Sequence, residues 1–260
     1  MFKILGSRLL GRGVLGTSRI YTTARLLTGA FIASAALMGC SEETVSSTNI
    51  KTAGIAGLFE VTAGNATSST AKATLVVGGD ESNTYVNLDN GDKLIASAGT
   101  ESKTMNSGDG AGRYEANFAT GAGGTEFTIV LERPDDTNAP GNTGILPAPF
   151  EITEVPSTTP SRKTDAITIK WDNAAASEME IEIDGDCVFK STFTAPSGTS
   201  EYTIDAGEID STGVKPEDEK TCDLKVKMTR MSTGSTDSAL DNESRFRLYQ
   251  TRSTSFASAP

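Results

Sequence analysis

Alternation of apolar and polar residues in the second half of the chain constrains the fold more than any other feature. Apolar side chains occupy every second position in four runs, and charged or polar side chains occupy the positions between them. These runs are 167–171 (ITIKW), 179–183 (MEIEI), 222–228 (CDLKVKM) and 245–248 (RFRL). A period of two places the apolar side chains on one face of a strand. Strands with one apolar and one charged face predict antiparallel sheets that cover a core on one side only.

The first half carries the same pattern less regularly. Clusters of Gly, Ser, Asn and Asp separate its apolar runs, and Asn90-Gly91 is a strong signal for a hairpin turn. The runs are 73–77, 85–88, 93–96, 114–118 and 127–131. We find almost no helical periodicity, so the predicted fold class is all-β.

A segment rich in turn formers, 134–143, separates the halves, and Pro147 and Pro149 follow it. It is the best candidate for a domain boundary. We therefore predict a first β-sandwich domain at 51–146 and a second at 147–260, each of immunoglobulin size. The alternative is one larger sandwich in which 134–143 is a surface loop.

The second unit resembles immunoglobulin-like and fibronectin type III modules. Its 167–171 run resembles their second strand, with Trp171 as the core tryptophan, and 222–230 resembles the penultimate strand before a turn at Gly234. The resemblance covers residues 147–260 at most. Together with the similar length of the first unit, it leads us to expect two immunoglobulin-like antiparallel β-sandwich domains in tandem. It implies no particular function, because such modules serve many.

The N-terminal 39 residues have the parts of a secretory signal. They contain five basic residues and no acidic ones, and 26–39 (LLTGAFIASAALMG) is uncharged and apolar. This run is shorter than the ~20 residues that cross a bilayer as a helix. A mitochondrial presequence is the alternative for the basic part.

The end of this leader, Leu37-Met38-Gly39-Cys40, resembles the lipobox of bacterial lipoproteins. The resemblance implies a signal peptide at 1–39, cleavage before Cys40 and lipid on that cysteine. Ser41 in place of an aspartate implies sorting to the outer membrane. The polar residues at 40–50 then predict a flexible lipidated tether. In the alternative reading, Cys40 is only a small residue of an ordinary signal peptide.

Charge argues against nucleic-acid binding. The chain has 23 basic and 34 acidic residues, and removal of the five basic leader residues leaves 18 against 34, a net charge of −16. Such a surface repels nucleic acid and anionic lipid, and it attracts divalent cations.

The two remaining cysteines, Cys187 and Cys222, are an isolated pair. In an exported protein such a pair predicts one disulfide, and the alternative is two buried thiols.

Histidine is absent, which excludes Ser-His-Asp and Cys-His catalysis and His-ligated metals. Paired carboxylates, as in a glycan hydrolase, remain the one catalytic option, and 34 acids make chance pairs inevitable. Two turns offer hard oxygen ligands for calcium, through Asp184 and Asp186 and through Asp89 and Asp92. The alternative is that these acids only build and solvate the turns.

We therefore expect a non-catalytic, lipid-anchored envelope protein that acts in binding, adhesion or scaffolding, without a cofactor apart from the candidate calcium. Its expected partners are the membrane, through Cys40, and envelope proteins or glycans. The alternatives are a calcium-dependent carbohydrate- or protein-binding module and, less favoured, a histidine-free glycan hydrolase.

Overall fold

The computed structural model describes residues 42–213, 215 and 218–260, and no α-helix occurs among them. The described residues form three sheets, the largest of ten strands. Its main path runs through β1 (Glu43–Ser46), β4 (Thr84–Asn87), β3 (Ser68–Val77), β2 (Ile55–Asn65), β17 (Arg245–Ser258), β16 (Cys222–Thr233), β13 (Met179–Asp184) and β14 (Ser191–Ala195). Two further strands, β8 (Arg113–Phe118) and β7 (Asn106–Ser107), continue it from β3. The all-β prediction is confirmed.

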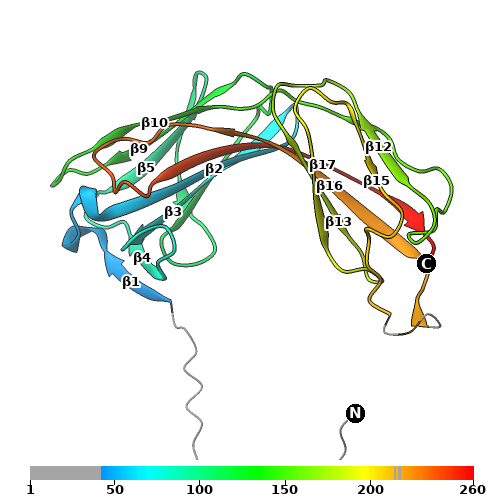
Figure 1. Cartoon of the computed structure of the whole chain (residues 1–260). Helices are drawn as coiled ribbons and strands as arrows, with labels where there is room; N and C mark the ends of the chain where they lie inside the picture. The colour runs from blue at the N-terminus through cyan, green and yellow to red at the C-terminus, as the bar shows by residue number, and fades with distance from the viewer. Residues whose placement is uncertain (1–41, 214, 216–217) are drawn as a thin grey trace, which may run out of the picture. The chain divides into compact units, whose positions relative to one another are not determined.

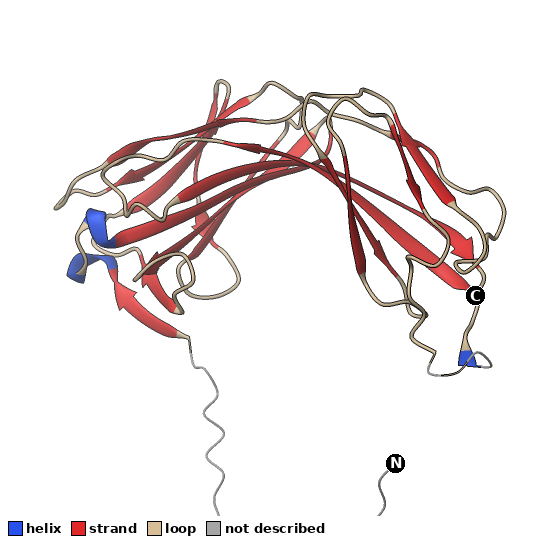
Figure 2. Ribbon diagram, in the orientation of Figure 1, coloured by secondary structure: helices blue, strands red, loops and turns tan. Residues whose placement is uncertain are grey.

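Two smaller sheets pack against the long sheet. One has the order β10 (Ala139–Ile145), β9 (Glu126–Glu132), β5 (Lys93–Ala98) and β6 (Glu101–Thr104). The other has the order β11 (Ile152–Glu154), β12 (Ile167–Trp171) and β15 (Glu201–Ile204). In Figure 1, β5, β9 and β10 lie over β2, whereas β12 and β15 lie over the other end of β16 and β17. Figure 2 shows the same layers with strands in red.

Each small sheet closes one hydrophobic core. The first core includes Phe59, Phe127 and Phe246, and the second includes Trp171, Ile181 and Val226. The second core lies between the three strands β11, β12 and β15 and the four strands β14, β13, β16 and β17. Two antiparallel layers with seven strands are the arrangement of an immunoglobulin-sized sandwich. The predicted core position of Trp171 is confirmed by an exposed fraction of 3%.

Strand β17 belongs to both cores. Phe246 and Leu248 pack in the first core and Phe256 packs in the second. All three occupy even positions on one strand, and its pairing with β16 is continuous over twelve positions. Since side chains alternate between faces, both cores lie against the same face of the long sheet.

The structure therefore differs from the predicted division into 51–146 and 147–260. Residues of the predicted second domain, Leu240, Phe246 and Leu248, complete the first core. Residues 41–260 group as one compact unit. The reason is the length of β17, a strand of fourteen residues that pairs with β2 at its first half and with β16 over twelve positions.

Two turn signals have roles that differ from the prediction. Asn90 and Gly91 do form a turn with positive φ (54° and 85°), but β4 before it and β5 after it belong to different sheets. The turn therefore carries the chain from one layer to the other and closes no hairpin. The segment 134–143 is not a linker, because it turns between β9 and β10 within the first sandwich.

The predicted flexible tether at 40–50 is wrong for its described part. Strand β1 pairs in parallel with β4, and two 3-10 turns follow, η1 (Ser47–Asn49) and η2 (Thr52–Gly54). Buried Arg133 holds this segment: its guanidinium donates to the carbonyl oxygens of Ser47 (2.6 Å) and Ile50 (2.9 Å) and to the Thr52 hydroxyl (3.1 Å). The stabilising side chain comes from more than 80 residues away, so no local pattern reveals it.

Candidate functional site

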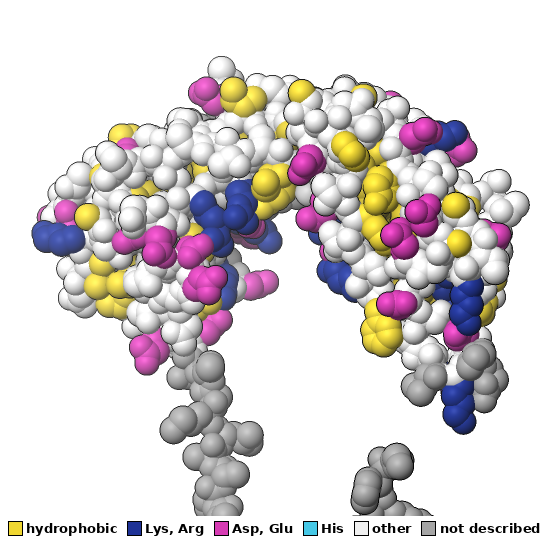
Figure 3. All heavy atoms as spheres, viewed as in Figure 1, with side chains coloured by type: hydrophobic (Ala, Val, Ile, Leu, Met, Phe, Trp, Pro, Cys, Tyr) yellow, Lys and Arg dark blue, Asp and Glu magenta, His cyan; other side chains and the backbone are white. Residues whose placement is uncertain are grey.

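The face of the long sheet opposite the two cores is not covered by either small sheet, and it is a candidate binding surface. On β17 this face carries the odd-numbered side chains, which include Arg247, Tyr249 and Ser253. A row of alternating charge crosses the first-core half, with Arg247, Glu60, Lys72 and Glu115 opposite one another in register. Figure 3 shows basic side chains (dark blue) and acidic side chains (magenta) on the part of the molecule between its two ends.

The charged rows predicted in the second half lie on neighbouring strands of this face. Glu182 of β13 is opposite Lys227 of β16, and Asp184 is opposite Lys225. The shortest ion pair of Glu182 goes to Lys190, however, at 2.6 Å, and its carboxylate raises the pKa of Lys190 through a hydrogen bond. These rows lie on the solvated faces of adjacent strands, with opposite charges facing one another in register.

A groove lies where the second-core half of this face meets the shared strands. It has a volume of about 270 Å³ and is lined by Glu178, Glu180, Thr194, Thr229, Met231 and Tyr249. Strand register explains the grouping: Glu180 is opposite both Thr194 and Thr229, and Met231 is opposite Tyr249. Four strands thus contribute one continuous lining.

A buried polar junction lies on the opposite side of the sheet from this groove. Arg230 follows Thr229 on β16, points toward the cores and is 1% exposed. Its guanidinium carbon and that of Arg252 lie 5.1 and 5.6 Å from the centre of the Phe150 ring. Arg252 also donates to Glu151 at 2.8 Å. Burial lowers the pKa of Arg230, although a guanidinium remains protonated at neutral pH.

Met231 and Tyr249 were not singled out from the sequence. Both stand at polar-face positions, one residue out of phase with the core-facing side chains of their strands. Met231 is 46% exposed, one of three large exposed apolar side chains among the described residues. An apolar residue on the polar side of an alternating run is the signal that finds them.

The four acids predicted as calcium ligands lie in two separate places. Asp92 is buried against Arg133, whose Nε donates to its Oδ2 at 2.9 Å, while Asp89 is exposed. Asp184 and Asp186 border a hollow of about 390 Å³ that also contains Asp223, Lys225 and Ser255. Within the described part of the chain, no three acidic, cysteine or histidine side chains gather as a metal site. Calcium binding stays a prediction.

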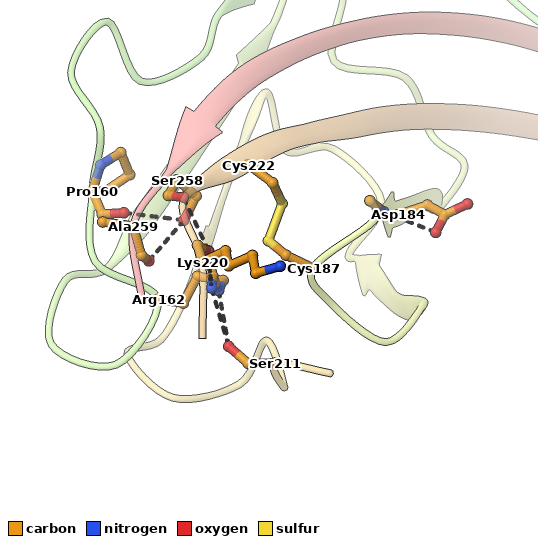
Figure 4. The surroundings of a disulfide bond; sticks show 10 residues. Pro160, Arg162, Asp184, Cys187, Ser211, Lys220, Cys222, Ser258 and Ala259 are labelled. Atoms are coloured by element: carbon orange, nitrogen blue, oxygen red, sulfur yellow. Dashed lines mark hydrogen bonds between the residues drawn. A yellow bond between two sulfur atoms is a disulfide. The ribbon is translucent and has the colours of Figure 1, made fainter. Parts of the chain in front are cut away.

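The predicted disulfide between Cys187 and Cys222 is present, with the two Cα atoms 6.1 Å apart (Figure 4). Buried Arg162 lies beside it and donates to the carbonyl oxygens of Ser258 (3.0 Å) and Lys220 (2.9 Å). The disulfide ties the loop after β13 to the first residue of β16, and the Arg162 guanidinium ties the residues just before β16 to the end of β17.

Cys40 and the leader at 1–39 lie outside the described residues. None of the helical segments that the structure does describe has the length and apolar character needed to span a membrane.

No protein-family model and no curated protein matches this sequence. Among solved structures, the chain is similar to a segment of two fibronectin type III domains from chicken tenascin, with 10% sequence identity and a TM-score of 0.24. The match covers 78% of this chain and 99% of that one. At this TM-score the assignment of the fold depends on the sheets and cores described above.

Proposed function

We propose that this chain is a non-catalytic, lipid-anchored protein of the cell envelope, whose uncovered sheet face serves as a binding or scaffold surface. The observation that carries the proposal is the continuity of that face across both cores. Because the two smaller sheets cover only one side of the long sheet, the other side of β2, β17, β16 and β13 is open to a partner. Scaffolding needs such an extended rigid surface and no reactive group.

The lipobox supports the anchored location, with lipid on Cys40 and the outer membrane as the expected site. The described chain begins at Glu42, which pairs with Arg113 at 3.0 Å, and β1 starts at the next residue. Because an extended residue spans at most ~3.6 Å, lipid on Cys40 holds β1 within about 11 Å of its attachment point. The folded part then stands close to the membrane without a long linker.

Fractionation of the native host tests the anchor. The wild-type chain should sediment with outer membranes and carry an acylated N-terminal cysteine by intact-protein mass spectrometry, because several acyl chains make dissociation negligible. Cys40→Ser should release it or leave the precursor uncut. Ser41→Asp is the matched control: it keeps the lipid and redirects the protein to the inner membrane. A wild-type protein without lipid would refute the anchor.

Site-specific photo-crosslinking tests the surface. A photoreactive amino acid at Ser253, exposed on the open face of β17, should give a discrete adduct in living cells. The control position is Thr203, which is equally exposed but lies on β15 of the small sheet. Equal adducts at both positions, or none at Ser253, would contradict a binding role of the open face.

A further inference from the structure

Two carboxylates in the groove of the open face form no ion pair among the described residues. Of the acids on and beside β13, Glu182 pairs with Lys190, whereas Glu178 and Glu180 form no salt bridge or side-chain hydrogen bond among the described residues. Arg247, further along β17 on the same face, stands opposite Glu60 in register. Lys190 is near enough for the charge of Glu180 to help raise its pKa, but its ion pair is with Glu182. The groove therefore presents two carboxylates without a bonded counter-ion.

The same groove has an apolar floor. Met231 and Tyr249 are cross-strand partners, and Met231 is 46% exposed although it is a large apolar side chain. An aromatic ring attracts a cation over its face, and a thioether packs against aliphatic chains. The apolar pair Met231 and Tyr249 and the two glutamates therefore match a side chain that has an aliphatic stem and a positively charged end.

We propose that this groove binds a lysine or arginine side chain presented by an extended segment of a partner protein. The stem of the bound residue lies on Met231 and Tyr249, and its charged end lies between Glu178 and Glu180. The hydroxyls of Thr194 and Thr229 accept its remaining N–H donors. The volume of about 270 Å³ holds one such side chain and not a folded domain. Charge complementarity selects this occupant, because an anion is repelled and a neutral sugar leaves both charges uncompensated.

This assignment rests on the proposed function, since it gives the open face its ligand, but its test requires neither the lipid nor the native host. The probe is tetralysine, added to the purified full chain in detergent. The readout is the ε-methyl NMR signal of Met231, assigned by its loss in Met231→Leu. We expect a saturable shift that weakens as salt is added, because salt screens exposed charges.

The double variant Glu178→Gln/Glu180→Gln should lower the affinity about tenfold, which corresponds to two exposed ion pairs. Its matched control, Glu60→Gln/Glu115→Gln, removes the same charge from the other half of the same face and should leave the affinity unchanged.

Three outcomes would overturn the assignment: no shift with tetralysine, an equal effect of both double variants, or a Met231 shift with a neutral oligosaccharide in place of tetralysine. A shift that depends on protein concentration without any peptide would instead identify a second copy of this chain as the occupant. If these tests fail while the photoreactive residue at Ser253 still gives its adduct, the groove is not the binding site, but the proposed binding or scaffold role of the open face remains.

Discussion

Phe246 and Phe256 lie ten residues apart on one strand, point to the same side of it, and fill different hydrophobic cores. Phe246 also packs edge-on against Phe59 of β2, with ring centres 5.9 Å apart. Between them, Gln250 and Arg252 are buried at the polar junction. One strand thus contributes to two sandwiches, and neither sandwich has a complete sheet without it.

The two cores should therefore unfold together. Fluorescence of Trp171, the single tryptophan, reports on the second core, and hydrogen exchange of the amides of β5 and β9 reports on the first. Urea titrations followed by these two probes should coincide, as in a cooperative transition. Separated midpoints would show that the shared strand does not couple the cores.

Loss of the Asp92 carboxylate should destabilise the first core. Arg133 and Asp92 have side chains only 3% and 5% exposed, and the second carboxylate near Arg133, that of Asp136, lies farther away at 3.6 Å. Asp92→Ala therefore removes the closer counter-charge of a buried guanidinium. The free energy of unfolding should fall by about 3 kcal/mol, the low end for a broken buried pair, because Asp136 remains. Asp89→Ala, at the exposed start of the same turn, is the control and should change it by less than about 0.5 kcal/mol. Equal losses of stability in the two variants would mean that the ion pair between Arg133 and Asp92 does not stabilise the fold.

Reduction of the disulfide should weaken the protein without abolishing its core. The bond between Cys187 and Cys222 closes a loop with a sequence separation of 35, for which the chain-entropy model gives roughly 3–4 kcal/mol. Urea unfolding with and without dithiothreitol measures this loss. Cys187→Ser/Cys222→Ser should match the reduced wild type and be insensitive to the reductant; an unchanged midpoint on reduction would argue against the bond.

Trp171 should stabilise the second core through the apolar surface that it buries, and not through a hydrogen bond of its indole N–H. It is 3% exposed, and its indole nitrogen has no hydrogen-bond partner among the described residues. Trp171→Ala should cost about 3–5 kcal/mol in thermal unfolding of the whole chain, and Trp171→Phe clearly less. Lys170→Ala, on the exposed side of the same strand, should have little effect. A tolerated Trp171→Ala would remove the proposed role in the core.

Stability should decline in alkali through Tyr114. Burial raises the pKa of this phenol above its ordinary value of ~10, and the hydroxyl accepts a hydrogen bond from the Leu88 N–H at 2.7 Å. The folded state holds this proton more tightly than the unfolded state. The contribution is therefore complete below the unfolded pKa and is lost as pH rises through the folded pKa. Tyr114→Phe should flatten the fall in urea midpoint above pH 10, and an equally steep fall in this variant would contradict the role of Tyr114.

Local pattern was sufficient to predict some elements and not others. The alternating runs around Ile169, Ile181 and Val226 became β12, β13 and β16, because period-two alternation is a property of a few neighbouring residues. The docking of 43–52 on Arg133 and the sharing of β17 depend on partners 80 to 190 residues away. The groove was not predicted: the alternation places Glu180 on the charged face of its strand, but its position beside Met231 and Tyr249 follows from strand register.

The position of β17 after all the other described strands in the sequence also sets an order for folding in the cell. Ribosomes deliver the polypeptide from its N-terminus, so the first 240 residues emerge before the strand that pairs with β2 exists. Until then, the β2 edge remains unpaired, and unpaired edges invite association with other chains. A product that stops short of Arg245 therefore lacks a strand of both sandwiches. Neither sandwich can then fold completely, so a truncated chain should be degraded as a whole.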